Sequence, residues 1–336
     1  MSNGVTQNCK DLSRRLHPAP QREAIVTRSY SRGYPDVSSV ARTSEDFLTQ
    51  LSPGDMVCHA RTVSVGRASL IGLWERPKCV GGSVLSPDLT GVLFPLCWDD
   101  EFVMNGHCMA RGEVYSVDSP LGFLSRGVNR YFYGLQVERQ ALLNSLAALQ
   151  GVQLEDVTLP HGPLRLTYGF VAWLSYRFHR EIHRAEDQGM TQQHSRAFVE
   201  FLYQVMLEIH SFEQPSIRPR SGWRRATQIV RLAEARFAAM QGASISLADL
   251  CAASCSSSTT LYQAFEQVVG MPPLRYFRAR GINTVHQKLL KSANNRGAVT
   301  ECATSHGFTE LGRFSIEYKK IFGVSPSVTL AAVSSG

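Results

Sequence analysis

The sequence lacks the features that define several large classes of protein. No apolar run approaches the roughly 20 residues of a membrane span. The segment Met1 to Cys9 is polar and has no apolar core of the kind found in signal peptides. A glycine-rich phosphate loop, a dinucleotide fingerprint and a nucleophile-elbow motif are also absent. We therefore expect a cytoplasmic protein with no membrane partner, and we predict no catalytic residues.

The sequence also lacks a convincing set of metal ligands. Its eight cysteines are scattered and form no CxxC pair, which disfavours a disulfide framework or a zinc finger and favours buried, reduced thiols. His179 and His183 have the spacing of a metalloprotease helix, but Arg180 stands where that motif requires Glu. A metal-dependent cupin enzyme would need a His-x-His cluster, whereas His59 and His107 are far apart. We predict neither a metal nor a cofactor.

Net charge is missing from the first two-thirds of the chain. Residues 1–221 hold 22 Lys and Arg against 22 Asp and Glu, whereas residues 222–336 hold 13 against 6. The whole net charge of +7 therefore lies in the C-terminal third. A basic domain beside a neutral one is typical of nucleic-acid binding, although a solvated basic surface gives the same count.

The N-terminal part is predicted to be rich in β-structure. Residues 1–43 are rich in Ser, Arg and Pro and are expected to form a loose arm, and Ser44 to Ser52 is predicted to be a short amphipathic helix. Short β-rich runs punctuated by Gly, Pro, Asp and Asn then favour an antiparallel sandwich or barrel. The expected strands are Met56–Val63, Ala68–Trp74, Gly91–Leu96, Glu101–Met104, Val114–Val117, Gly122–Leu124 and Arg130–Val137. Seven aromatic residues are expected to form the barrel core or to line a pocket: Trp74, Phe94, Trp98, Phe102, Tyr115, Phe123 and Tyr131.

Amphipathic helices follow the predicted strands, at about 138–149, 163–185 and 193–212. The apolar stripes of the last two fit either a core face or a dimer seam. Residues 213–223, which contain Pro215 and Pro219, are predicted to be an interdomain linker. This divides the chain into an arm (1–43), a domain of strands and helices (44–212), a linker (213–223) and a helical domain (224–330).

Two stretches of the C-terminal third repeat the same order of apolar, turn and stop residues. Their offset is 52 residues before the turn and 53 after it, which indicates a duplicated unit. Each copy predicts a short helix (about 247–254 and 299–306), a tight turn and a second helix, which together make a helix-turn-helix. The first short helix begins with a capping-box pattern at Ser246-Leu247-Ala248-Asp249, and a helix at about 273–292 joins the units. The matched positions are Leu250 and Cys302, Phe265 and Tyr318, Gly270 and Gly323, and Pro273 and Pro326.

The second copy resembles the signature of the AraC/XylS family of bacterial regulators. The resemblance lies in Gly307-Phe308, Arg313-Phe314-Ser315, Tyr318-Lys319-Lys320 and Phe322 to Ser327, and it extends over about residues 222–330. It implies a mixed fold, with an N-terminal cupin-like β-barrel and dimerising helices before an all-α domain of two helix-turn-helix units. By this resemblance, residues 44–212 are expected to be an effector-binding and dimerisation domain, and residues 224–330 a DNA-binding domain. Cys255 and Gly281 depart from the family, which usually has Gly in the first turn and Arg in the connecting helix.

The resemblance also implies the partners and the DNA-contacting residues. The expected partners are double-stranded promoter DNA, RNA polymerase, a small-molecule effector and a second copy of the chain, and the expected location is the bacterial nucleoid. Gln263 is predicted to contact adenine and Arg313 guanine, with a phosphate contact or a plain surface charge as the alternative for Arg313. The expected first recognition helix presents Ser258, Thr259, Tyr262 and Gln263, and the second presents Glu310, Leu311, Gly312, Arg313 and Ile316. Basic residues expected at phosphates or in solvent are Arg275, Arg278, Arg280, Lys319 and Lys320.

The sequence thus predicts an effector-responsive transcriptional regulator, most readily an activator. A ligand-independent DNA-binding regulator, or a repressor, remains an alternative within the same class. An enzyme with an appended DNA-binding domain is the alternative from another class, and it would need convergent His and carboxylate side chains inside the barrel.

Overall fold

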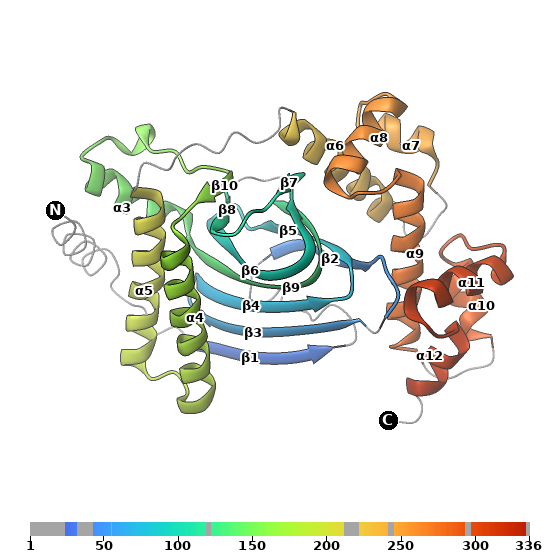
Figure 1. Ribbon diagram of the computed structural model, residues 1–336, viewed down its shortest axis with the longest axis horizontal. Helices are drawn as coiled ribbons and strands as arrows, with labels where there is room; N and C mark the ends of the chain where they lie inside the picture. The colour runs from blue at the N-terminus through green and yellow to red at the C-terminus, as the bar shows by residue number, and fades with distance from the viewer. Residues whose placement is uncertain are drawn as a thin grey trace.

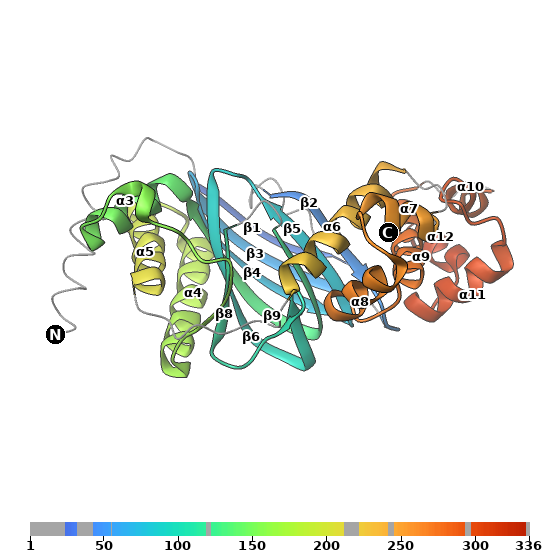
Figure 2. The ribbon, with the colours of Figure 1, turned by 90° about the horizontal axis from the view of Figure 1, so that it is seen from above.

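The computed structural model describes residues 24–31, 43–54, 56–118, 122–211, 222–240, 245–292 and 297–333. These residues form three layers along the long axis of the molecule (Figure 1). One group of helices lies at one end, a curved antiparallel sheet lies in the middle, and a second group of helices lies at the other end, as the view from above makes clear (Figure 2).

Among the described residues, the central sheet contains ten strands, and all of their pairings are antiparallel. Its main path runs β1-β3-β4-β9-β6-β8-β10, and β2 joins through β5, which pairs with β9. The strands are β1 (Ala24–Ser31), β2 (Thr43–Gln50), β3 (Val57–Val65), β4 (Ala68–Arg76), β5 (Cys79–Leu85), β6 (Leu89–Met104), β7 (His107–Cys108), β8 (Glu113–Val117), β9 (Phe123–Glu138) and β10 (Gly162–Arg165).

Two predictions for the first fifty residues are wrong. Within the expected arm, residues 24–31 form β1, which pairs along its whole length with β3; residues 1–23 and 32–42 lie outside the described part. The expected helix at 44–52 is strand β2, paired with β5. The pairing shifts register between Ser44 and Phe47. Such an irregularity breaks the two-residue alternation by which a strand is recognised in sequence.

All seven predicted strands are present, but several are longer than expected. The 16-residue strands β6 and β9 each join two predicted runs, because the chain bends through register shifts instead of turning. Strands β5, β7 and β10 were not predicted. In β5, Gly81 and Gly82 lower the strand propensity, yet a Cβ at Gly82 would lie only 2.7 Å from the Leu124 side chain. Close packing of β5 therefore requires the same glycines that made the strand difficult to predict from the sequence.

Three helices cover one face of the sheet. They are α3 (Arg139–Gln150), α4 (Tyr168–Gln188) and α5 (Gln192–Ser211), with a single 3-10 turn at Leu154–Asp156. Helix α4 begins five residues later than predicted because residues 162–165 pair with β8 as β10. Leu174, Phe178 and Leu202 are fully buried against strand residues such as Phe94 and Leu135. The inward stripes of α4 and α5 are therefore core faces.

The opposite, concave face of the sheet is filled by a second apolar cluster. It includes Phe102, Tyr115 and Phe132, and Trp223 from the C-terminal part closes it. The indole of Trp223 stacks on His161 with ring centroids 5.6 Å apart. Of the seven aromatic residues singled out above, Phe94, Phe102 and Tyr115 are buried, while Trp74, Trp98, Phe123 and Tyr131 are partly buried.

The C-terminal helices are built around two further apolar clusters. The first unit and α6 share one cluster, which also takes in Val80 and Leu124 from the sheet. The second unit has its own, around Phe314 and Tyr318. The helices are α6 (Trp223–Ala239), α7 (Leu247–Ala253), α8 (Ser258–Val268), α9 (Pro273–Leu289), α10 (Ala298–Thr304), α11 (Leu311–Phe322) and α12 (Pro326–Val333).

Candidate nucleic-acid interface

The first unit is a helix-turn-helix made by α7 and α8. The predicted capping box is present, with Asp249 N–H donating to the Ser246 hydroxyl and Ser246 N–H donating to the Asp249 carboxylate. Ser257 caps α8 by accepting from the N–H of Thr260. Between the helices, Cys255 has a φ of 47°, in the left-handed region. A residue with a Cβ thus occupies the conformation that favours glycine.

The second unit repeats this arrangement with α10 and α11. Gly307, 52 residues after Cys255, has a φ of 79°, and Gly323 ends α11 with a φ of 75°. A residue in the left-handed conformation ends many helices, and glycine adopts it without the steric cost of a Cβ. The two turns therefore have the same backbone geometry, although only the second has the residue best suited to it.

Each second helix is anchored by fully buried side chains. In α8 these are Leu261 and Phe265, and in α11 they are Phe314 and Tyr318. His286 of α9 supports the second unit, since its ring stacks on Phe322 at 3.8 Å and its Nδ1 lies 2.6 Å from the Tyr318 hydroxyl. Burial lowers the pKa of His286 to about 4, so this ring is neutral at pH 7.

The predicted base-contacting residues of α8 lie on its outer surface. Ser258, Thr259, Tyr262 and Gln263 are all exposed, as expected for a helix that buries Leu261 on its other side. Gln263 also lines a groove of about 520 Å³ between α8 and the sheet, together with Arg126 and Cys108. The exposed face of α8 is therefore open to solvent at the start of the helix, at Ser258 and Thr259, whereas Gln263 borders the groove beside the sheet.

The predicted residues of α11 are exposed, with one exception. Glu310, Gly312, Arg313 and Ile316 are exposed, and Ile316 keeps 61% of its accessible surface. Leu311 is half-buried and packs against the core of the second unit. The Arg313 Nε donates to Glu317 at 3.1 Å while the side chain stays 63% exposed. An exposed ion pair of this kind contributes little to stability and is easily exchanged for another partner.

The basic residues expected at phosphates fall into two groups. Lys319, Lys320 and Arg275 are exposed. Arg278 is half-buried, pairs with Glu317 and lies over the Phe308 ring at 5.5 Å.

Arg280 lies away from the exposed surface. It pairs with Glu234 at 3.2 Å and its guanidinium lies 4.2 Å from the Phe47 ring centroid. Arg280 thus belongs to the contact between the sheet and the helices, because its planar cation satisfies a buried carboxylate and an aromatic face together.

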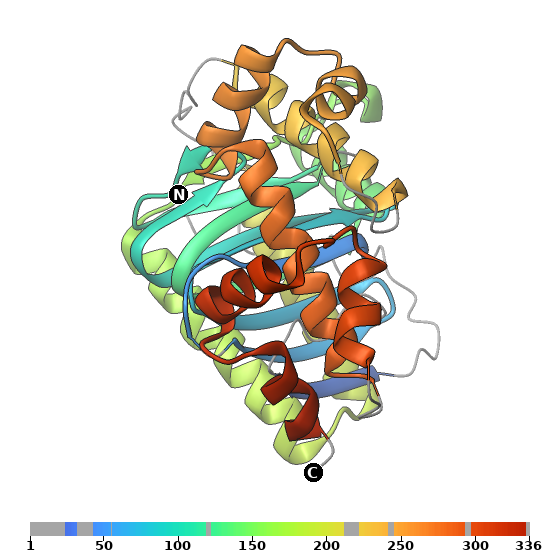
Figure 3. The same cartoon turned by 90° about the vertical axis from the view of Figure 1, so that its right-hand side faces the viewer.

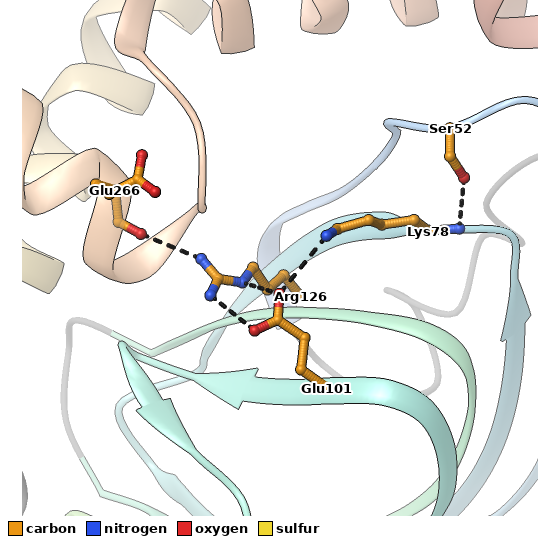
Figure 4. A network of polar contacts seen from close by, with 5 residues as sticks. All are labelled: Ser52, Lys78, Glu101, Arg126 and Glu266. Carbon is orange, nitrogen blue, oxygen red and sulfur yellow. Dashed lines mark hydrogen bonds and ion pairs between the residues drawn. The ribbon is translucent and has the colours of Figure 1, made fainter.

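The contact between the sheet and α8 is a polar feature that the sequence analysis missed. The Arg126 guanidinium binds both oxygens of Glu101 at 3.0 Å and donates to the carbonyl oxygen of Glu266 at 3.2 Å (Figure 4). Lys78 lies 3.6 Å from the same Glu101 carboxylate. These two cations lower the pKa of Glu101, although its burial acts in the opposite direction. No local sequence motif links Arg126 to a residue 140 positions away.

Comparisons with known proteins place the repeated units in a family. A model described as a helix-turn-helix domain matches residues 250–332, which include both units. The XylDLEGF operon transcriptional activator 2 of Pseudomonas putida is 39% identical over 88 residues, covering 26% of this chain and 56% of that protein. A probable thc operon regulatory protein of Rhodococcus erythropolis is 28% identical over 204 residues, covering 59% of this chain and 60% of that protein. The resemblance to the AraC/XylS family is thus confirmed for the C-terminal helix-turn-helix domain.

The matches to these AraC/XylS relatives are partial. The chain spans about half the length (56%) of the first curated relative it matches and 27% of a second Pseudomonas putida activator, which is 37% identical over 86 residues. Two solved structures also match. The AraC-like transcriptional activator CuxR has a TM-score of 0.39 at 13% identity, covering 83% of this chain and 99% of that one. ToxT from Vibrio cholerae has a TM-score of 0.30 at 12% identity, covering 75% and 100%.

Within the described ranges, no group of three or more His, Cys, Asp or Glu is arranged to hold a metal ion. No described helix has both the length and the apolar character needed to cross a bilayer. Cys58 and Cys79 are buried free thiols, as expected, whereas Cys97, Cys108 and Cys255 are exposed.

Proposed function

We propose that this protein is a sequence-specific DNA-binding transcriptional regulator that acts as an activator. The observation that carries the proposal is the duplicated helix-turn-helix, in which α8 and α11 both bury one face and leave the predicted base-contacting face exposed. The net charge of +7, which lies in the same third of the chain, supports it. Named relatives of this family act as operon activators, which favours activation over repression.

The two recognition helices supply different chemistry to the major groove. Gln263 offers the paired donor and acceptor that match adenine, and Arg313 offers the fork that matches guanine. Ile316, 61% exposed, suits contact with a thymine methyl group. Lys319 and Lys320, exposed at the end of α11, suit phosphates and carry no sequence information. The protein then acts in the bacterial cytoplasm on double-stranded promoter DNA, with RNA polymerase as its functional partner.

The sheet and its covering helices are proposed to form a cupin-like, effector-responsive dimerisation domain. Helix α4 exposes 46% of Trp173 and 65% of Tyr176 next to one another on its outer face. Exposed aromatic side chains at helical spacing suit a helix of a second copy, and sedimentation velocity of a Trp173→Glu variant tests this. An effector acts by shifting the population of a DNA-competent state. If no effector exists, the same domain serves only for dimerisation, and the protein is a ligand-independent regulator.

Substitution of Arg313 tests the DNA-binding proposal. A DNA sequence selected in vitro by the full chain is titrated in mobility-shift assays, together with all of its single-base variants. We expect Arg313→Ala to weaken binding by about 1–3 kcal/mol and to lose discrimination at one base pair. Arg111→Ala, at an exposed arginine in the turn before β8, is the matched control and should bind like the unmodified chain.

The outcome separates two roles for Arg313. Weakening that is uniform over all variants would make Arg313 a phosphate contact. Failure of the unmodified chain to select any sequence would refute the proposed function itself.

A further inference from the structure

The two helix-turn-helix units are joined to each other mainly through one helix, α9. Its first half, with Tyr276 and Phe277, lies in the core of the first unit, and its second half, with Ile282 and Val285, lies in the core of the second. These two apolar clusters share no residue. The relative position of α8 and α11 therefore depends on the straightness of α9 and on whatever else spans the units.

The sheet makes a second connection, at the middle of α9. Gln50 is the last residue of β2 and is fully buried. Its backbone N–H donates to Asn283 Oδ1 at 2.9 Å, and Asn283 Nδ2 donates to the Gln50 carbonyl at 3.1 Å. The Asn283 carboxamide thus pairs with the strand as a neighbouring strand would, and it satisfies backbone groups at a strand end.

The side chain of Gln50 extends this connection to the second unit. Its Nε2 donates to the carbonyl of Ile321 at 2.8 Å, as well as to the carbonyls of Ser52 and Gly54. Ile321 lies in the last turn of α11, where the backbone carbonyls have no partner within the helix. A fully buried side chain of the sheet therefore holds the end of the second recognition helix.

The first recognition helix is held in the same way. Arg126, which Glu101 orients, donates to the carbonyl of Glu266 near the end of α8. A Cβ at Gly270, just beyond α8, would lie 2.4 Å from Arg126 Nη1, so the two segments are in close contact. Both recognition helices are thus attached to one sheet through a carbonyl of their C-terminal turns. Figure 3 shows α9 running in front of the sheet, between the two units.

We propose that the sheet sets the separation and tilt of the two recognition helices, with Gln50 and Arg126 as positioning residues, so that the protein accepts only one half-site spacing. The inference rests on the proposed DNA-binding function. Insertion of one base pair between half-sites moves the second groove by about 3.4 Å and rotates it by roughly 35°. Two recognition helices that are each fixed to the sheet at the C-terminal turn cannot follow that movement, whereas two units joined by α9 alone can bend to follow it.

The test uses the full chain and a DNA site that it selects in vitro. Mobility-shift titrations compare this site with versions that carry one base pair more or less between the half-sites. We expect the unmodified chain to lose at least about tenfold in affinity for either altered site. Gln50→Met keeps the side-chain volume but has no hydrogen-bond donor. We expect the affinity of this variant for either altered site to be less than about threefold below its affinity for the selected site. Asn283→Ala should behave in the same way and covers the case in which Gln50→Met does not fold.

A control variant separates spacing from stability. Leu146→Ala removes buried side-chain volume in α3, on the far side of the sheet, and should keep the spacing preference despite its lower stability. Equal discrimination by Gln50→Met, Asn283→Ala and the unmodified chain would overturn the proposal, as would tolerance of altered spacing by the unmodified chain. If the unmodified chain selects no DNA sequence, the proposed function fails and this inference fails with it.

Discussion

Replacement of Cys255 by glycine should stabilise the protein. Cys255 and Gly307 occupy equivalent positions in the two turns, with φ values of 47° and 79°. A left-handed conformation costs a residue with a Cβ roughly 1–2 kcal/mol. Glycine loses about 0.4–1 kcal/mol more on folding because its unfolded chain is freer. The difference predicts that Cys255→Gly raises the free energy of unfolding by about 0.8 kcal/mol.

The thiol of Cys255 makes little difference to this balance. It is exposed, and its Sγ lies 3.8 Å from the carbonyl of Ala252, which is at most a weak hydrogen bond. A gain of this size should raise the thermal midpoint by about 1–2 °C, which differential scanning calorimetry of the reduced protein resolves. Urea titration gives the same quantity as a shift of the midpoint at constant slope.

Two companion variants decide whether backbone strain is the cause. Cys255→Ala keeps a Cβ and should leave the stability nearly unchanged. Gly307→Ala should lower it by about 0.8 kcal/mol, the same change with the opposite sign. If Cys255→Ala stabilises as much as Cys255→Gly, the gain comes from loss of the thiol and the argument from the left-handed turn is wrong.

The remaining predictions concern pH and the effector. His286, whose pKa is lowered from 6.5 to about 4 by burial, binds a proton more readily in the unfolded chain; its neutral form therefore stabilises the protein fully above pH 6.5, and this stability is lost as pH falls from 6.5 towards 4. Urea midpoints should drop across that window, and His286→Phe should reduce the slope but leave the part due to His161 and His210, whose pKa values are also lowered to about 4. For the effector, thermal-shift screening with small carboxylates, amines and aromatic compounds should find a compound that raises the midpoint of the full chain; absence of a shift across all three classes would favour a ligand-independent regulator.

The C-terminal helices were predictable because their determinants are local. The capping box at Ser246 and Asp249, the buried pairs of α8 and α11, and the glycine at 323 all act within a few residues of one another. A periodic pattern over so short a range is sufficient to predict a helix from the sequence.

The contacts between the sheet and the helices could not be predicted in this way. Gln50 meets Asn283 and Ile321 across 233 and 271 residues, and Arg280 meets Glu234 across 46. Separation in sequence also explains why residues 44–52 were predicted to be a helix, since pairing with β5 decides the structure of β2. A glycine inside a helix usually weakens it, but a Cβ at Gly281 of α9 would lie 3.2 Å from the Phe308 ring, so glycine at this position permits close packing.

Helix α6 has a consequence for how the molecule unfolds. Its first residue, Trp223, completes the apolar cluster on the concave face of the sheet, while Ala226, Ile229, Val230 and Ala233 of the same helix belong to the core of the first unit. The sheet therefore cannot lose its structure without exposing the first unit to water, and the two should melt as one cooperative body. The second unit, with a core of its own, is free to open locally. The two copies of the repeated unit should therefore unfold differently. The first copy unfolds together with the sheet, and the second copy can open by itself.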